Sequence, residues 1–420
     1  MRVFLDLLLP SFLVHLTQAL LITTLPLFVL STLEESKTHV GIAVGAIGLG
    51  KVMSDIPAGM LLEKIGARTL MIVCGTVVCL SALLMLAASS TASYPLVVVA
   101  MILCGAGESV GVISRLSIVS EEVPSDQRGR VSALLGGSAR IAMAIGPLYS
   151  GFVVTMTGST NSVFLSQAVL AIASVIVVFA NRSGTLSTSV ERTARTPPIF
   201  LGMRRLVSLL LHVTIFILSI QLVRECRKLI IPLSSFSAGL SVREVSIFTS
   251  ISFTIDALLF PYAGKIMDGY GRAFAGVLSV SIMSIALLIV VPVTTFSSLL
   301  LCAIGTGIGN GFSSGIIVAF GADLAPNDST RSKFLGYFRL CADLGELVGP
   351  LLVGIVAQFT SIPTMINTVV AAGVVGSFWL LTFVPDGGWG KLSSSPPVPS
   401  TPLAAKDDST EDPPLVSVNR

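Results

Sequence analysis

Residues 59–68, GMLLEKIGAR, form a short charged break between two long apolar runs, and this stretch has a second copy in the chain. Residues 264–272, GKIMDGYGR, interrupt another pair of apolar runs 205 residues later. Each copy has an acidic residue four positions after its first glycine, a second glycine seven positions after it, and an arginine close behind. A loop that recurs at such a spacing indicates an internal repeat, with one structural unit in each half of the chain.

Two further matches support the repeat. Residues 103–108, LCGAGE, correspond to residues 305–310, GTGIGN, which lie 202 residues later. Residues 146–151, GPLYSG, correspond to residues 349–354, GPLLVG, which lie 203 residues later. The three spacings agree within three residues, so we expect two halves with the same order of structural elements.

The composition is that of a membrane protein. Hydrophobic residues make up 53% of the 420 residues and charged residues 12%, whereas an ordinary soluble chain has about 25% charged residues. A soluble enzyme, a disordered chain and a nucleic-acid-binding protein are therefore disfavoured, and the net charge of +3 indicates no polyanionic partner. Runs of about 20 apolar residues span a bilayer as helices. Twelve spans are predicted, near residues 4–32, 40–62, 69–89, 95–119, 130–156, 162–180, 206–231, 244–264, 273–293, 296–322, 333–358 and 362–384.

The loops indicate how the spans are organised. Six spans in each half give both halves the same orientation, related by an axis along the membrane normal. Loops on one side carry 17 basic residues and loops on the other side two, which places both termini in the cytoplasm. We expect an N-terminal six-helix bundle (1–180), a cytoplasmic linker (181–205), a C-terminal six-helix bundle (206–384) and a disordered cytoplasmic tail (385–420). The expected location is the plasma membrane, with an organelle membrane as the alternative.

No cofactor is expected. The six cysteines all lie in apolar runs, without a C-x-x-C pair or a histidine cluster, so no metal site is predicted. The chain has no G-x-x-x-x-G-K-S/T loop, which argues against direct use of ATP. It also shows no set of nucleophile and base at useful spacing, so an intramembrane enzyme is not favoured.

The doubled loop resembles the signature loop of the major facilitator superfamily, and the resemblance extends over nearly all of residues 1–384. Ala67, Gly269 and Ala273 stand where that loop usually has basic residues. The resemblance implies an all-α integral membrane fold of two pseudo-symmetric six-helix bundles, and loops that latch the two bundles together in one conformation. The loop positions are Gly59, Glu63, Lys64, Gly66 and Arg68 in the first copy and Gly264, Asp268, Gly271 and Arg272 in the second.

Other positions also resemble motifs of this family. Arg115 is similar to its fourth-helix arginine, and Arg224 with Arg227 to a seventh-helix pattern. Gly146-Pro147 resembles the helix-bending motif of the drug:proton antiporter branch, and its repeat copy is Gly349-Pro350. Ala133, Ala142 and Ser150 replace glycines of that motif. The resemblance implies a functional monomer that carries a small-molecule solute across the lipid bilayer.

Charged residues inside the spans are the candidates for chemistry, because each charge near the bilayer centre costs at least about 2.5–3.5 kcal/mol. Glu108 is flanked by glycines and has no cation within one helical turn, so we expect it to exchange a proton or to hydrogen-bond a neighbouring helix. Arg140 needs a partner or an anion, either Glu108 or an anionic group of the solute. Asp256 is the repeat equivalent of Lys51 and is expected to meet it or to titrate. Other expected cavity residues are His15, Gln18 and Asn310.

Spacing also predicts buried ion pairs. Lys51 and Asp55 are four residues apart on one helical face, as are Arg339 and Asp343, with Glu346 close by. For both pairs a structural role is at least as plausible as contact with a solute.

These observations predict a secondary transporter that works by alternating access. A proton gradient is the expected energy source, with Glu108 first and Asp256 second as proton carriers. The alternative is a transporter-like receptor or scaffold without solute flux. The spans hold seven cations and seven acids, a balance that selects neither an anionic nor a cationic solute, and the direction of transport is equally open.

Overall fold

The computed structural model describes residues 7–124, 127–180, 203–292, 294–324 and 331–383. Within these ranges all regular structure is helical. Most of the expected linker, residues 181–202, and all of the expected tail, residues 385–420, lie outside the described residues.

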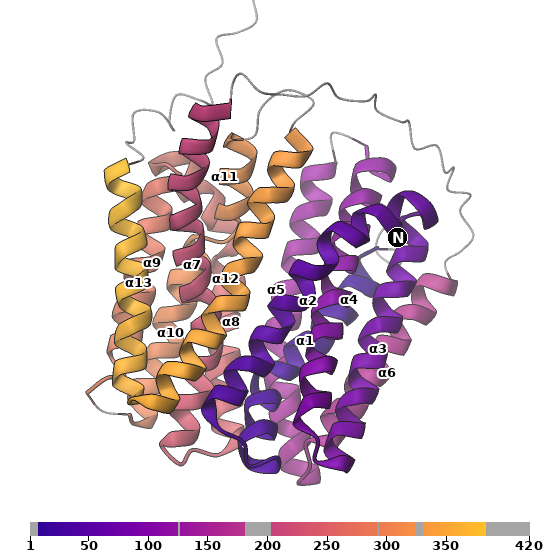
Figure 1. Cartoon of the computed structure of the whole chain (residues 1–420), viewed down its shortest axis with the longest axis vertical. Coiled ribbons are helices and arrows are strands. Elements are labelled where there is room, and N and C mark those ends of the chain that lie inside the picture. The colour runs from indigo at the N-terminus through magenta and orange to yellow at the C-terminus, as the bar shows by residue number, and fades with distance from the viewer. Residues whose placement is uncertain (1–6, 125–126, 181–202, 293, 325–330, 384–420) are drawn as a thin grey trace, which may run out of the picture.

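The N-terminal half forms one bundle of six helical segments, drawn from indigo to magenta in Figure 1. Its first segment, α1, continues into a π-helical turn, η2, before the chain reverses. The segments are α1 (Leu9–Leu27) with η2 (Phe28–Thr32), α2 (Lys37–Ile65), α3 (Ala67–Thr91), α4 (Tyr94–Glu122), α5 (Arg128–Thr157) and α6 (Asn161–Ala180).

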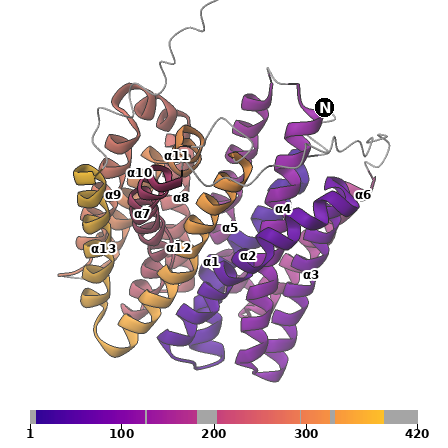
Figure 2. The same cartoon turned by 45° about the horizontal axis from the view of Figure 1, so that its top comes forward.

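The C-terminal half forms the second bundle, beside the first in both views (Figures 1 and 2). Its fourth segment is divided into two helices, α10 and α11. The helices are α7 (Met203–Ser237), α8 (Val242–Tyr270), α9 (Arg272–Leu288), α10 (Phe296–Phe312), α11 (Ile316–Leu324), α12 (Arg331–Phe359) and α13 (Ile362–Phe383).

In the described part of the chain, ten of the twelve segments are long and apolar enough to cross a membrane by themselves. The other two are α9, with 17 residues, and α7, whose side chains are described only from Val213 onward, a part that carries four charged residues between positions 224 and 228. The expected fold of twelve membrane-spanning helices in two six-helix bundles is confirmed.

The second glycine of each signature loop has a specific backbone role. Gly66 (φ +78°) and Gly271 (φ +93°) adopt conformations that other residues rarely tolerate. The N–H of Gly66 caps α2 by donating to the carbonyl of Leu62, and the N–H of Gly271 caps α8 by donating to Met267. Each glycine thus ends one helix and lets the next begin one residue later, which explains why the doubled loop contains it.

Small residues bring helices together within each half. A Cβ on Gly105 of α4 would lie 3.0 Å from the Cα of Ile47 in α2 and would also meet the Ile47 carbonyl. At the equivalent place, a Cβ on Gly307 of α10 would lie 2.5 Å from the carbonyl oxygen of Ser252 in α8. The repeat in the sequence is therefore a repeat of helix contacts as well.

The two halves pack most tightly at the end opposite the linker, which we call the far end. A Cβ on Gly41 of α2 would lie 2.5 Å from the carbonyl oxygen of Pro350 and 2.8 Å from the Cα of Gly354 in α12. On the other side of the interface, a Cβ on Gly151 of α5 would lie 2.5 Å from the Cβ of Ser246 in α8. The backbones are too close for larger residues, so the far end is closed.

The other end, where α6 finishes and α7 begins, is called the tail end. A Cβ at Gly59 of α2, Gly129 of α5 or Gly264 of α8 would meet no other atom within 4 Å. The glycines of α2 and α5 thus contact the other half closely at the far end, whereas Gly59 and Gly129 at the tail end do not.

Candidate functional site

Two adjoining cavities lie between the halves, each of about 270 Å³. Residues of α1, α4, α5 and α7 line both of them. The shared lining residues are Gln18, Glu108, Met143, Glu225 and Lys228. The cavities are therefore treated as one site with two sides.

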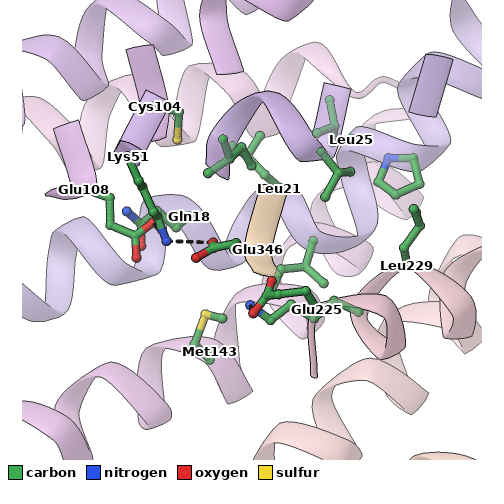
Figure 3. Close-up of a pocket in the computed structure, with 15 residues that line it drawn as sticks. Gln18, Leu21, Leu25, Lys51, Cys104, Glu108, Met143, Glu225, Leu229 and Glu346 are labelled. Atoms are coloured by element: carbon green, nitrogen blue, oxygen red, sulfur yellow. Dashed lines mark hydrogen bonds and ion pairs between the residues drawn. The ribbon is translucent and has the colours of Figure 1, made fainter. Parts of the chain in front are cut away.

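The first side is organised by Lys51 of α2, and Figure 3 shows its side chain between two carboxylates. Its ammonium group lies 2.8 Å from Oε2 of Glu108 in α4 and 2.7 Å from Oε1 of Glu346 in α12. Only 8% of the Lys51 side chain is exposed. Because Glu108 and Glu346 belong to different halves, Lys51 joins the two halves at mid-depth. We call these three residues the lysine cluster.

The expected pair between Lys51 and Asp55 is replaced by this arrangement. The Asp55 carboxylate instead accepts a hydrogen bond from the hydroxyl of Ser109 in α4. The ammonium of Lys51 has two acidic partners in other helices, which spacing along a single helix does not reveal. The second expected pair is present, with 3.5 Å between Nε of Arg339 and Oδ2 of Asp343.

An ion pair within α7 completes the wall between the two cavities. Nζ of Lys228 lies 2.7 Å from Oε1 of Glu225, one helical turn away. The amide of Gln221 donates to the same carboxylate oxygen over 3.4 Å. The charges of Lys228 and Glu225 cancel, so this pair adds no net charge to the site.

The second side is organised around Asp256 of α8. Its carboxylate accepts hydrogen bonds from the amide of Asn310 at 2.7 Å and from the hydroxyl of Ser314 at 2.9 Å. Two guanidinium groups lie slightly farther away, with Nε of Arg140 at 3.8 Å and Nη2 of Arg227 at 3.7 Å. Asp256 therefore faces Arg140 and Arg227 rather than Lys51, its repeat equivalent.

Arg140 reaches this side from α5, in the other half of the molecule. Its guanidinium lies 3.9 Å from the centre of the Phe260 ring, a stacking distance. Its Nη1 donates to the carbonyl of Gly136. Glu108 pairs with Lys51 instead, so the expected alternative of a Glu108–Arg140 pair is not formed.

The two α7 arginines are held by hydroxyl and carbonyl groups. Nη2 of Arg224 donates to the carbonyl of Ser313 at 2.6 Å and to its hydroxyl at 2.5 Å. Nη1 of Arg227 donates to the hydroxyl of Ser252 at 2.8 Å and to the carbonyl of Thr306 at 3.3 Å. Arg140, Arg224, Arg227 and Asp256 are named the arginine cluster, and all four line the second cavity.

The break between α10 and α11 places several of these partners. The chain leaves the helix at Ser313 and Ser314, and Gly315 has φ +85°. Irregular backbone is tolerated inside a membrane where it lines a cavity, because its polar groups then find partners. The sequence predicts one uninterrupted span at 296–322, whereas the structure divides it into α10 and α11. The Ser-Ser-Gly run at the centre of the break is the signal that marks it.

Two predicted cavity residues lie in α1. Nδ1 of His15 is 3.4 Å from Oε1 of Gln18, and both side chains line the second cavity beside Glu108. Arg115 is only 6% exposed, in α4, and is not among the residues that line the two cavities.

The helix-bending motifs serve packing inside each half. Pro147 lies within α5 and Pro350 within α12. A Cβ on Gly146 would lie 2.8 Å from the backbone of Ala19 in α1, and one on Gly349 would lie 3.4 Å from the Leu222 carbonyl oxygen in α7. The two copies thus bring equivalent helices together, α5 against α1 and α12 against α7.

The signature loops lie at the tail end, away from the cavities. Oδ1 of Asp268 pairs with Nη1 of Arg272 at 3.0 Å, and the Asp268 side chain is 74% exposed. Glu63 and Lys64, in the last turn of α2, are exposed. Arg68 lies beyond Gly66, in the first turn of α3. With the tail ends of the halves apart, both loops are on the surface. Among the described residues, no group of three histidines, cysteines or acids is arranged to hold a metal ion.

The chain matches the family model of the Major Facilitator Superfamily over residues 7–224 and 228–412. Among solved structures it is similar to a mutant form of the nucleoside transporter NupG, with TM-score 0.72 and 17% identity over 91% of this chain and 99% of that one. A D-xylose-proton symporter gives TM-score 0.74 and 15% identity over 92% and 98%. No curated protein sequence matches the chain.

A transporter of the POT family, solved with a thioalcohol-conjugated peptide, is also similar, with TM-score 0.70 and 13% identity over 89% of this chain and 94% of that one. At these identities the solved structures show a shared fold. The family match covers both halves and both cavities. The chain therefore belongs to the major facilitator superfamily and is a multi-pass membrane transporter.

Proposed function

We propose that this protein moves a small solute by alternating access, with the solute bound in the two adjoining cavities between the halves. The observation that carries the proposal is the placement of charged side chains at mid-depth on both halves, around cavities of about 270 Å³. Charges at this depth are costly and mark a binding or coupling role. The family favours transport over the alternative of a receptor without flux.

The state of the interface supports this cycle. The halves are packed shut at the far end and apart at the tail end, which is one of the two states that alternating access requires. With both termini in the cytoplasm, as the basic loops predict, this is the inward-facing state. In the outward-facing state the signature loops are expected to latch the tail ends together. Both cavities are formed by one chain, which favours a functional monomer.

We further propose that transport is coupled to protons through the lysine cluster. One ammonium group faces two carboxylates, so the cluster carries a formal charge of −1 and becomes neutral when one proton binds. Glu108 is the favoured carrier because it lines both cavities. Asp256, the second candidate, lines only the second of the two cavities, and its carboxylate already has two hydrogen-bond donors and two guanidinium groups around it.

Replacing Glu108 by Gln tests this coupling. The variant keeps the size of the side chain and removes its titration, so we expect solute flux into proteoliposomes to lose its dependence on a pH gradient. The probe solute is the metabolite that most stabilises the purified full-length protein in a thermal-shift screen. The measurement is uptake with and without an imposed gradient, together with internal pH from an enclosed dye.

The matched control is Glu244→Gln. Glu244 caps α8 at the far end, and Gln can fill the same capping position. This control is expected to behave like the wild type. Flux by Glu108→Gln that still follows the pH gradient would show that Glu108 does not carry the proton.

A further inference from the structure

We propose that the arginine cluster binds an anionic group of the solute, a carboxylate or a phosphate or sulfate group. This inference rests on the proposed transport function and assigns a chemical class to the solute. It concerns Arg140 on α5 together with Arg224 and Arg227 on α7, all of which line the second cavity.

The formal charge of the cluster is the first observation. Three guanidinium groups share one carboxylate, Asp256, which leaves a charge of +2 at mid-depth in the membrane. The lysine cluster, on the other side of the site, carries −1. Uncompensated charge in a low-dielectric interior is costly, so the arginine side is the one that gains most from an anion.

The second observation is that Asp256 does not use the guanidinium donors. Its hydrogen bonds come from Asn310 and Ser314 at 2.7 and 2.9 Å. The arginine nitrogens nearest to it, on Arg140 and Arg227, are 3.7–3.8 Å away, beyond the usual range of about 2.7–3.2 Å for N–H···O bonds. Asp256 therefore attracts Arg140 and Arg227 without taking up their N–H donors, of which only Nη1 in each is bonded to protein groups within the described part of the chain.

Buried donors without partners are the third observation. The Nε atoms of Arg140, Arg224 and Arg227 are all buried, and none has a hydrogen-bond partner among the described residues. An unmade hydrogen bond of a charged group costs more than that of a neutral one. The planar fork of a guanidinium matches the oxygens of carboxylates and phosphates, which bind it through two parallel bonds.

The position of the three arginines ties the anion to transport. Arg140 belongs to the N-terminal half, and Arg224 and Arg227 belong to the C-terminal half. An anion held between them contacts both halves at once, as a solute must if its binding is to bias how the halves close. Glu108 also lines this cavity, and the lysine cluster to which it belongs carries a formal charge of −1, which repels a second anionic group. A monoanion or a zwitterion therefore fits the site better than a dianionic chain does.

Simple oxyanions test the inference without knowledge of the natural solute. Thermal unfolding of the purified full-length protein is followed in sodium acetate, phosphate, sulfate and chloride at equal ionic strength. We expect at least one oxyanion to raise the melting temperature above the chloride value with a saturable dose response. Acetate as the best probe indicates a carboxylate ligand, and phosphate or sulfate indicates the larger oxyanions.

Variants separate a site from a general salt effect, because sulfate and phosphate also stabilise proteins by exclusion from the surface. Arg224→Gln is expected to raise the half-saturating concentration at least tenfold. Arg140→Gln, at a side chain that is 22% exposed, gives the same test if Arg224→Gln does not fold. Arg243→Gln alters an exposed arginine at the start of α8 and is expected to leave the wild-type response unchanged.

The inference is overturned if no oxyanion exceeds chloride in the wild type. It is equally overturned if the foldable arginine variants keep the wild-type half-saturation. A failure of the transport proposal gives a different result. Proteoliposomes would then show no flux of any solute, but oxyanions would still stabilise the wild type and would still bind more weakly to the arginine variants. Flux of neutral or cationic solutes that is unchanged in the arginine variants would instead leave transport intact and refute the anion site.

Discussion

At the scale of single residues, Lys51 links the two halves through ion pairs. Its ammonium holds one carboxylate from its own half and one from the other half, within 2.8 Å of each. Glu108 and Glu346 are 19% and 13% exposed, so water screens the two contacts only partly. Removal of the ammonium leaves two carboxylates close together with no counter-ion, and breaking a buried pair in this way typically costs about 3–5 kcal/mol.

Lys51→Met is therefore expected to destabilise the purified protein by about 3 kcal/mol, the lower end of that range because both acids are partly exposed. The double variant Lys51→Met with Glu346→Gln is expected to recover part of this loss, because it removes one of the stranded charges. Denaturant unfolding of the wild type and both variants measures their free energies of unfolding, and the double variant is expected to lie between the wild type and Lys51→Met.

Lys265→Met serves as the comparison, since Lys265 lies beside the exposed Tyr262 ring near the tail end of α8. Its free energy of unfolding is expected to stay close to that of the wild type. Equal stability of the Lys51 and Lys265 variants would mean that the lysine cluster does not contribute to stability.

Charged side chains around the two cavities stand out in the sequence, because a charge within an apolar run is costly. The sequence does not identify their partners. Spacing on one helix predicts a pair of Lys51 with Asp55, whereas the actual partners of Lys51 are 57 and 295 residues away along the chain. The sequence does not predict a helix break at Ser313 and Ser314, because hydroxyl side chains interrupt an apolar pattern only weakly.

At the scale of elements, the repeated loops show how a motif determines local structure. Gly66 and Gly271 have positive φ at the same place in both halves, at the junctions of α2 with α3 and of α8 with α9. The break between α10 and α11 depends on a third such residue, Gly315. The helix boundaries predicted from the sequence agree well with the structure because these glycines and the charged loops mark them clearly.

Gly271→Ala tests the role of the loop glycine. Space is not limiting, since a Cβ there meets nothing within 4 Å, but its φ of +93° is unfavourable for alanine. Its ψ of 155° places it in a region used almost only by glycine, so strain of about 1–3 kcal/mol is expected, seen as a lower melting temperature of the purified protein.

Gly269→Ala is the matched comparison in the same loop, where a Cβ also meets nothing and where φ is not positive. It is expected to be neutral or slightly stabilising. The same loss of stability at both positions would show that the backbone conformation at Gly271 is not the cause.

At the scale of the whole molecule, the two halves meet through glycine contacts at the far end and through charged side chains at mid-depth. The repeat predicts two bundles of the same design, and this much follows from the sequence. Which end is closed does not follow, because both states of an alternating-access cycle use the same helices and the same apolar pattern. The state is set by contacts such as that of Gly41 with Pro350 and Gly354.

Gly41→Ala is expected to open the far end. The added methyl group would lie 2.5–2.8 Å from backbone atoms of α12, which must move away. Spin labels at Glu34 and Ser361, one on each half at the far end, report the separation in a cysteine-free background. The distance distribution is expected to shift to longer values.

Gly137→Ala provides the control, because a Cβ at that position of α5 meets nothing within 4 Å. Its distances are expected to match those of the wild type. An unchanged distribution in Gly41→Ala would mean that the far-end contact does not hold the halves together.

Charge differences between equivalent positions have a consequence for how the two halves pair. Lys51 in one half corresponds to Asp256 in the other, and Arg140 corresponds to Asp343. A symmetric homodimer of the first half alone would place Arg140 against Lys51, and one of the second half would place Asp343 against Asp256. Like charges would then meet at mid-depth in either homodimer, so each half requires the other as its partner and cannot be replaced by a second copy of itself.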